Sequence, residues 1–330
     1  MAHLVGNEKT ISLLLMLALA VTFVASPIYG AQGEKIGVLV IAHGSEEEEW
    51  CNAIQQAVDN VELPYTVELG YLEFVLEQDI HVAVKRLERQ DIDKIIVVPL
   101  FISSFSSHIE EIKYVLGLRE TLPKPGRLPP NLTEGRGPPE GSAEGEEPIA
   151  VESESRFVLT PALDDHPLVA AILADRLAAI SKNPDEEILI LVGHGTNKER
   201  DLKRWRESFA SLARQVKARL DLKDARYGFV GWGTPPVRQV VERAQARGQV
   251  IVVPVMMAEG YFTRVAIPQT LEGLTYRYTG QPLTPHPNIS RLIELRVEEA
   301  ISSAPATREL AWAVLIAGLI AALFVFRLFS

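Results

Sequence analysis

The chain lacks the features that indicate several common classes of protein. It has one cysteine, Cys51, among 330 residues, which excludes an intramolecular disulfide, a cysteine-ligated iron–sulfur cluster and a cysteine-ligated zinc site. Basic residues are in deficit, since 33 lysines and arginines accompany 43 acidic residues, giving a net charge of −10. Nucleic acid is therefore not an expected partner, because phosphate binding needs a basic surface. No GxxxxGK[ST] sequence occurs, which argues against a reaction driven by ATP.

Both ends of the chain, in contrast, are strongly apolar. The run at 11–25 follows Lys9 and has the length and flanking charge of an export signal, so we expect residues 1–31 to form a signal peptide. A second apolar run predicts a transmembrane anchor at 310–328. A buried core helix is the alternative for each run. Together the two segments predict an extracytoplasmic protein, attached to the membrane by its C-terminal helix.

Between these ends, strands and helices alternate in the pattern typical of a parallel sheet covered by helices. The pattern occurs twice, and three pairs of segments carry the repeat: IAHGS (41–45) with VGHGT (192–196), GYLEF (70–74) with GFVGW (228–232), and IIVVPLF (95–101) with VIVVPVM (250–256). The offsets of 151, 158 and 155 residues indicate a domain duplication. We therefore expect an α/β fold with two similar doubly wound parallel-sheet halves, 35–183 and 184–303.

Residues 121–155 interrupt the first half. They are rich in proline, glycine, glutamate and serine, and have too few apolar residues to build a core. We interpret this segment as a disordered acidic insertion within the first half, not as a boundary between domains.

Three side chains with metal-binding chemistry follow consecutive strands of the first half. His43 comes directly after the first strand, Glu73 ends the second and His108 follows the third. Ligands of open parallel sheets bind beyond the carboxyl ends of the strands, so we expect the three to meet at one edge. Two imidazoles and a carboxylate suit a divalent ion such as Fe, Co, Ni or Zn, and leave coordination positions open for exchange.

The second half preserves only part of this set. His194 corresponds to His43, whereas the residue offset matches Glu73 with Gly231, and His108 with Phe262 or Thr263. A duplicated fold with a single active site would have this pattern. A histidine–glycine turn with a purely structural role remains the alternative.

Four motifs, VLVIAHGS, GYLEF, IIVVPLFISSFSSHIEEI and TPALDDHPLVAAILADRL, resemble the sirohydrochlorin cobaltochelatase/ferrochelatase family of ATP-independent class II chelatases, over roughly residues 35–302. The resemblance implies insertion of Co²⁺ or Fe²⁺, or Ni²⁺ in some members, into sirohydrochlorin during siroheme or cobalamin biosynthesis, with the metal as a substrate. It implies two halves that face each other across a cleft holding the tetrapyrrole. It also implies that His43 and His108 are the catalytic histidines that handle metal and protons, and that Glu73 joins them.

The tetrapyrrole carries many carboxylates, so hydroxyl groups beside the site are expected to bind it; these are Ser45, Ser103, Ser104, Ser106 and Ser107. The alternative is a non-catalytic protein of the same fold that carries a metal ion or a tetrapyrrole. Retention of His43, Glu73 and His108 favours the enzyme. Another chelatase, such as one acting on protoporphyrin, also remains open, and the sequence does not indicate an oligomeric state.

Overall fold

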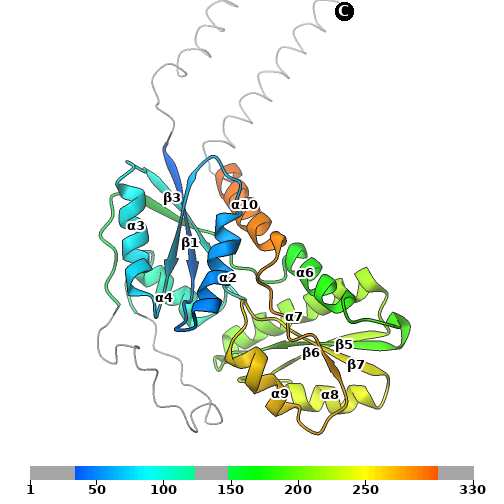
Figure 1. The fold of residues 1–330 in the computed structure, drawn as a ribbon. Coiled ribbons are helices and arrows are strands. Elements are labelled where there is room, and N and C mark those ends of the chain that lie inside the picture. The colour runs from blue at the N-terminus through cyan, green and yellow to red at the C-terminus, as the bar shows by residue number, and fades with distance from the viewer. Residues whose placement is uncertain (1–33, 123–147, 304–330) are drawn as a thin grey trace, which may run out of the picture. The chain divides into compact units, whose positions relative to one another are not determined.

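The computed structural model describes residues 34–122 and 148–303, and those from Ile36 onward belong to one compact unit. This part of the chain contains two four-stranded parallel sheets, with strand orders β2-β1-β3-β4 and β6-β5-β7-β8 (Figure 1). The two orders are the same pattern, shifted by four strands. The prediction of two similar parallel α/β halves is therefore confirmed.

The first half alternates strands with helices in the expected order. Its elements are β1 (Ile36–Ala42), α2 (Glu48–Asp59), β2 (Thr66–Tyr71), a 3₁₀ turn (Leu76–Gln78), α3 (Ile80–Glu88), β3 (Lys94–Pro99), α4 (Ser107–Val115), β4 (Arg156–Leu159) and α6 (Pro167–Ala178). The central strands β1 and β3 are almost wholly buried. Burial on both faces explains why their sequences are continuous apolar runs without alternation.

The second half repeats this order with one difference in its helices. Its elements are a 3₁₀ turn (Pro184–Glu186), β5 (Glu187–Gly193), α7 (Glu199–Leu220), β6 (Asp224–Phe229), α8 (Val237–Gln245), β7 (Gln249–Pro254), a π-helical turn (Phe262–Ala266), α9 (Ile267–Thr270), β8 (Arg277–Tyr278) and α10 (Pro287–Ser302). The segment that follows β7 thus begins with a π turn, a feature often associated with functional sites.

Successive residues of each central strand face different helices. In β1, Leu39 and Ile41 pack with α3 and α4, whereas Val38 and Val40 belong to a larger cluster that also contains α2 and α10. In the second sheet one face packs against α8 and α9, and the other joins the same larger cluster through α6 and α7. One hydrophobic core therefore runs through both halves.

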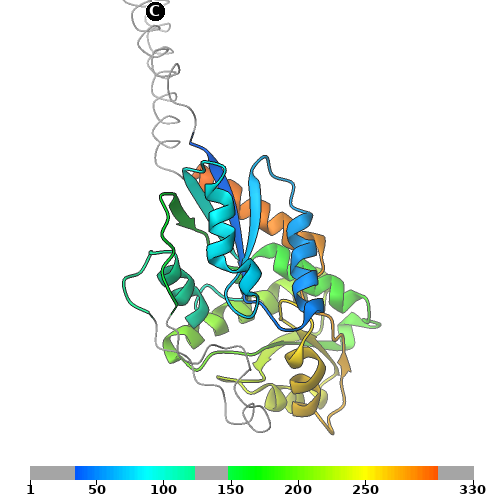
Figure 2. The ribbon, with the colours of Figure 1, turned by 60° about the vertical axis from the view of Figure 1, so that its left-hand side comes forward.

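The last helix of each half packs against the opposite half. Helix α6, which ends the first half, contacts α7 and β7, whereas α10, which ends the second half, contacts α2, α6 and β3. Two hydrogen bonds fix α10 there: Ser290 Oγ donates to the Ala57 carbonyl at 2.7 Å, and Glu294 accepts from the Glu62 N–H at 2.9 Å. Figures 1 and 2 both show α10, in orange, beside the first half. The exchange of helices joins the halves.

The acidic insertion is described only at its flanks, and residues 123–147 lie outside the described part. The flank after it is attached to the first half: the Val151 N–H donates to the Val115 carbonyl at 2.7 Å, and Ser155 Oγ donates to the Ile92 carbonyl at 2.6 Å. The expected disordered segment therefore does not extend to residue 155, because its last residues pack at the edge of the first sheet.

The structure corrects the expectation of membrane attachment. Within residues 34–122 and 148–303, none of the helices combines the length and the apolar character that crossing a bilayer requires. The 22-residue helix α7 is long enough, but it is strongly charged. Membrane anchoring and the extracytoplasmic placement that depended on it are therefore not retained. The segments that suggested them, 1–31 and 310–328, lie outside the described residues.

Candidate active site

His43 stands at the carboxyl end of β1 in a turn that fixes its ring. Gly44 follows with φ of +94°, a conformation that glycine adopts without strain. The Nδ1 atom of His43 lies 3.0 Å from the Gly44 carbonyl oxygen. A carbonyl oxygen only accepts hydrogen bonds, so Nδ1 is the donor and Nε2 is the ring nitrogen left for a ligand position. The turn thereby presents a ligand atom at the edge of the sheet.

Glu73 reaches the same place from the neighbouring strand. Its backbone N–H donates to the His43 carbonyl at 2.8 Å, which extends the β1–β2 pairing beyond the strands themselves. One carboxylate oxygen lies 3.9 Å from His43 Nε2, and both side chains are about one-third exposed. Solvent and solutes can therefore reach the pair.

His108 completes the group from the first turn of α4. The hydroxyl of Ser106 accepts a hydrogen bond from the Ile109 N–H and caps the helix, which holds the next turn in place. The ring of His108 meets that of His43 edge to face, with centroids 4.7 Å apart and planes at 89°. One ligand atom each from His43, Glu73 and His108 lies within 4.8 Å of the others. The structure thus brings together the three residues that the sequence singled out.

His108 is held in its neutral form. Its pKa is lowered to about 3, mainly by burial, and the neighbouring His43, His194 and Lys198 contribute to that fall. A neutral imidazole keeps its lone pair for a metal ion at physiological pH. The site is therefore suited to ligation by His108, not to ion pairing with it.

Glu111 is a fourth titratable residue here, and the sequence interpretation overlooked it. It lies three residues after His108 on α4, a spacing that puts both on one helix face. Burial raises the pKa of Glu111 to about 7, and the neighbouring charge of Glu73 contributes to the rise. A carboxyl group with that pKa exchanges protons near neutral pH. The helical spacing from His108 was the available signal.

The five serines expected to bind substrate are largely occupied by local structure. Ser45 accepts from the Glu47 N–H at 3.0 Å, Ser103 accepts from the Phe105 N–H at 3.1 Å, and Ser106 caps α4. Ser104 is fully used, because its hydroxyl donates to Asp164 at 2.5 Å and accepts from the Ala162 N–H at 2.8 Å. Ser107, at the start of α4, is half-buried. Ser104 is therefore the least available of the five for substrate.

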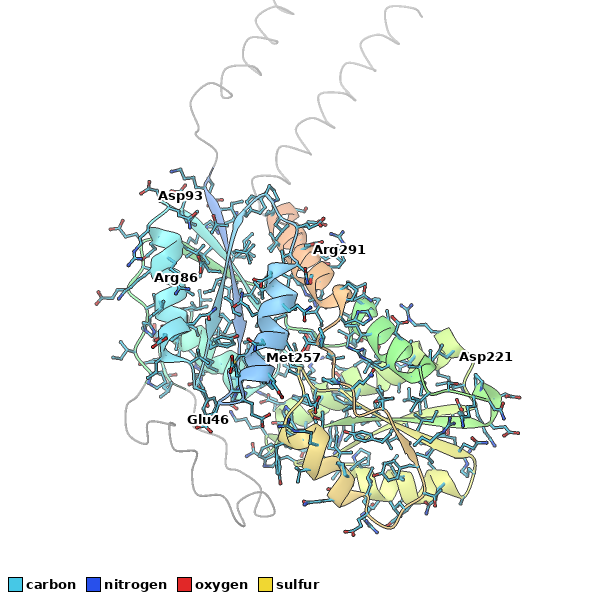
Figure 3. All side chains as sticks on the ribbon, viewed as in Figure 1. Glu46, Arg86, Asp93, Asp221, Met257 and Arg291 are labelled. Carbon is cyan, nitrogen blue, oxygen red and sulfur yellow. The ribbon has the colours of Figure 1, made fainter. Side chains whose placement is uncertain are left out.

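The acidic run after His43 begins α2. Glu48 and Glu49 lie in its first turn, where acidic side chains complement the helix dipole. Figure 3 shows Glu46 just before this helix, in the connection between β1 and α2. The run accordingly has a structural explanation that needs no metal.

The second half has the same turn with aromatic neighbours in place of ligands. His194 Nδ1 lies 2.8 Å from the Gly195 carbonyl oxygen, as in His43. The Trp232 N–H donates to the His194 carbonyl at 2.8 Å, and a Cβ on Gly195 would come within 1.8 Å of the Trp232 carbonyl oxygen. Glu73 has these same relationships with His43 and Gly44, so Trp232 is its structural counterpart. The Gly231 N–H also donates to the His194 carbonyl, at 3.2 Å, so the offset match with Gly231 holds in part; of the two residues, Trp232 is the one whose carbonyl packs on Gly195 as that of Glu73 packs on Gly44.

Phe262 is the counterpart of His108. Its ring lies 5.6 Å from that of His194, and Trp205 packs on the same imidazole at 4.8 Å. Burial lowers the pKa of His194 to about 4, with His43 acting in the same direction. Among the described residues, the second half therefore offers one neutral imidazole surrounded by aromatic rings, and no further metal ligand beside it.

A hydrogen bond connects the second half to the site in the first half. Trp205 Nε1, from the first turns of α7, donates to the Phe105 carbonyl at 2.9 Å. Because Phe105 lies just before α4, this bond ties the second half to the loop that presents His108.

Comparison with known proteins identifies a matching family and several relatives of this chain. The sequence model of the CbiX family matches residues 37–180 and again 188–300. The sirohydrochlorin cobaltochelatase of Methanocaldococcus jannaschii is 36% identical over 87 residues, 26% of this chain and 58% of that protein. The match thus spans a little over half of that relative's length. The sirohydrochlorin cobaltochelatase of Sulfurisphaera tokodaii is 26% identical over 119 residues, 35% of this chain and 94% of that protein.

Solved structures show the same fold. The protein SirB from Bacillus subtilis with Fe³⁺ aligns with a TM-score of 0.59 at 17% identity, covering 81% of this chain and 95% of that one. The sirohydrochlorin chelatase SirB in complex with cobalt, also from B. subtilis, aligns with a TM-score of 0.54 at 15% identity and the same coverage.

Proposed function

The chain belongs to the CbiX family, and on this premise we propose that it inserts a divalent metal ion, Co²⁺ or Fe²⁺, into sirohydrochlorin without ATP. The observation that carries the proposal is the group of ligand atoms from His43, Glu73 and His108, within 4.8 Å of one another at the carboxyl edge of the first sheet. The curated relatives named as sirohydrochlorin cobaltochelatases support the choice of substrate. Cobalt and iron remain alternatives, because this mixed ligand set suits both.

The metal is a substrate that the site holds and then releases. Three protein ligands leave coordination positions open, so pyrrole nitrogens can enter while the protein ligands leave one by one. Partial exposure of His43 and Glu73 gives the ion and the macrocycle access. The final state, with four ring nitrogens on one ion, provides the driving force, which explains why no nucleotide is needed.

Insertion also releases two protons from the ring for each divalent ion. Nε2 of His43 and the side chain of Glu73 face the ligand positions and are placed to accept a proton as they give up the metal. We assign to Glu111 the role of a further acceptor behind Glu73, since its pKa of about 7 suits proton exchange at neutral pH. The products are the metal-bound ring and two protons carried away by these groups.

The experiment is insertion of Co²⁺, and of Fe²⁺ without oxygen, into sirohydrochlorin by the full chain, followed by absorbance. We expect a rate above the uncatalysed background that is lost in the double variant His43→Ala, His108→Ala. His81→Ala is the matched control, because His81 lies on α3 and contacts the Ile149 carbonyl instead of the site. Spectral change from binding alone, with no rate above background, would replace the enzyme by a carrier of metal or tetrapyrrole.

A further inference from the structure

The helices that follow the two histidine–glycine turns are preceded by residues of opposite charge. Glu47 precedes α2, and Lys198 precedes α7. The two positions are structurally equivalent: the Glu47 N–H donates to the Ser45 hydroxyl at 3.0 Å, and the Lys198 N–H donates to the Thr196 hydroxyl at 3.3 Å. The duplicated position is thus acidic in the half that carries the ligand group and basic in the other.

A second pair of equivalent positions shows the same reversal. Two residues after His108 stands Glu110, and two residues after its counterpart Phe262 stands Arg264. Arg264 lies in the π-helical turn of the second half, and Glu110 in the first turn of α4. Around the two turns, the first half presents carboxylates and the second half presents cations.

Only one of the two ion pairs that this arrangement permits is formed. Arg264 binds Glu47 across the halves and also lies 3.9 Å from Glu259. The equivalent pairing would join Lys198 to Glu110. Glu110 instead binds Lys113, at 2.7 Å, and Arg119.

Lys198 is consequently left without a carboxylate partner within the part of the chain that the structure describes. It is half-buried, and it directly precedes α7, whose Trp205 donates a hydrogen bond to the Phe105 carbonyl in the loop before His108. A partly desolvated ammonium group gains most from an anion that replaces its lost hydration. No carboxylate among the described residues supplies that anion to Lys198. Because Lys198 lies beside the ligand group, a carboxylate of the substrate can supply it.

We propose that Lys198 binds a carboxylate of the tetrapyrrole, so that the first half holds the metal ion and the degenerate second half binds the anionic ring. The inference rests on the proposed function, because it takes the polycarboxylate macrocycle as the ligand. Arg264 has a different part: its pairing with Glu47 holds the π-helical turn against α2. The duplication is thereby explained, because one half carries a cation site and the other carries an anion site.

The test compares Lys198→Met with Lys217→Met, which removes the same charge near the other end of α7, where the Lys217 ammonium donates to the Lys223 carbonyl. Binding of metal-free sirohydrochlorin to the full chain is measured by absorbance titration. We expect Lys198→Met to weaken binding about tenfold, the effect of one charge-assisted contact. Lys198→Arg should restore most of it, and Lys217→Met should bind like the parent chain. Calorimetric binding of Co²⁺ alone should not weaken in Lys198→Met.

Steady-state rates distinguish the role of Lys198 from the proposed chelatase activity. Lys198→Met should raise KM for sirohydrochlorin and leave kcat nearly unchanged. If the parent chain binds the ring without turnover and Lys198→Met binds it weakly, the inference stands and the chelatase proposal fails. If the parent chain turns over and Lys198→Met matches it in KM and ring binding, the inference is overturned and the chelatase stands. A parent chain that does not bind the ring overturns both.

Discussion

The carbonyl oxygen of Glu73 lies so close to Gly44 that a Cβ atom at position 44 would come within 2.0 Å of it. The turn that presents His43 and the strand end that presents Glu73 are therefore packed backbone against backbone. We predict that Gly44→Ala displaces Glu73 from His43 and lowers both metal affinity and insertion rate. Calorimetric titration with Co²⁺ and the insertion assay measure the two effects.

Gly117→Ala is the control for that substitution. Gly117 also has a positive φ, of +67°, but nothing lies within 4 Å of its Cβ position. It should cost only the backbone strain, about 1 kcal/mol of unfolding free energy, and leave Co²⁺ affinity unchanged. Equal Co²⁺ affinity in the two variants would contradict the idea that backbone packing at Gly44 sets the position of Glu73.

Single substitutions should separate the two halves. His43→Ala and His108→Ala should each lower the insertion rate by about a hundredfold or more, because each removes a metal ligand, and His43→Ala also removes a proton acceptor. His194→Ala should leave most of the rate, since the aromatic rings of Trp205 and Phe262 surround that imidazole. Equal losses in all three variants would argue against a single active site, provided that thermal unfolding shows all three to be folded.

A second metal site should be recoverable in the degenerate half. Trp232 and Phe262 occupy the positions equivalent to Glu73 and His108, around a histidine whose Nε2 keeps its lone pair. The double variant Trp232→Glu, Phe262→His should therefore bind two equivalents of Co²⁺ in a calorimetric titration, where the parent chain binds one. Trp232→Gln, Phe262→His lacks only the charge and should bind the second equivalent more weakly. A stoichiometry of one in the first variant would refute the structural equivalence.

Acid stability should depend on Glu187, the buried first residue of β5. Burial would raise the pKa of Glu187, but hydrogen bonds from Ser181, the Lys182 N–H, Arg277 and the Asn183 N–H lower it to about 2. A carboxyl group with a depressed folded-state pKa stabilises the fold above its ordinary pKa of 4.5, and this contribution disappears as the pH falls through about 2.

Glu187→Gln should accordingly lower the unfolding free energy by up to roughly 3 kcal/mol at neutral pH. The difference from the parent chain should shrink as the pH falls below about 4.5, as measured by urea denaturation at a series of pH values. Glu186→Gln is the neighbouring control, because Glu186 is exposed and its carboxylate accepts from the Gln249 amide. A pH-independent difference would show that the Glu187 charge does not contribute.

Local sequence pattern was sufficient for most of the elements. Apolar runs such as IIVVP predict buried strands directly, since every residue of β3 is buried. The end of the second half is less regular than this pattern: its last strand is only Arg277–Tyr278, and the segment after β7 begins with a π turn. The expected membrane attachment was corrected, because none of the described helices is long and apolar enough to cross a bilayer.

The sequence by itself determined the duplicated α/β plan and the set of His43, Glu73 and His108, because parallel strands deliver their carboxyl ends to one edge whatever surrounds them. Tertiary structure alone decided that α6 and α10 pack against opposite halves, that Trp232 shares the place of Glu73 with Gly231, and that α7, which follows Lys198, contacts the loop that presents His108. These relationships depend on contacts between segments far apart in the chain, and neither periodicity nor spacing records which faces meet.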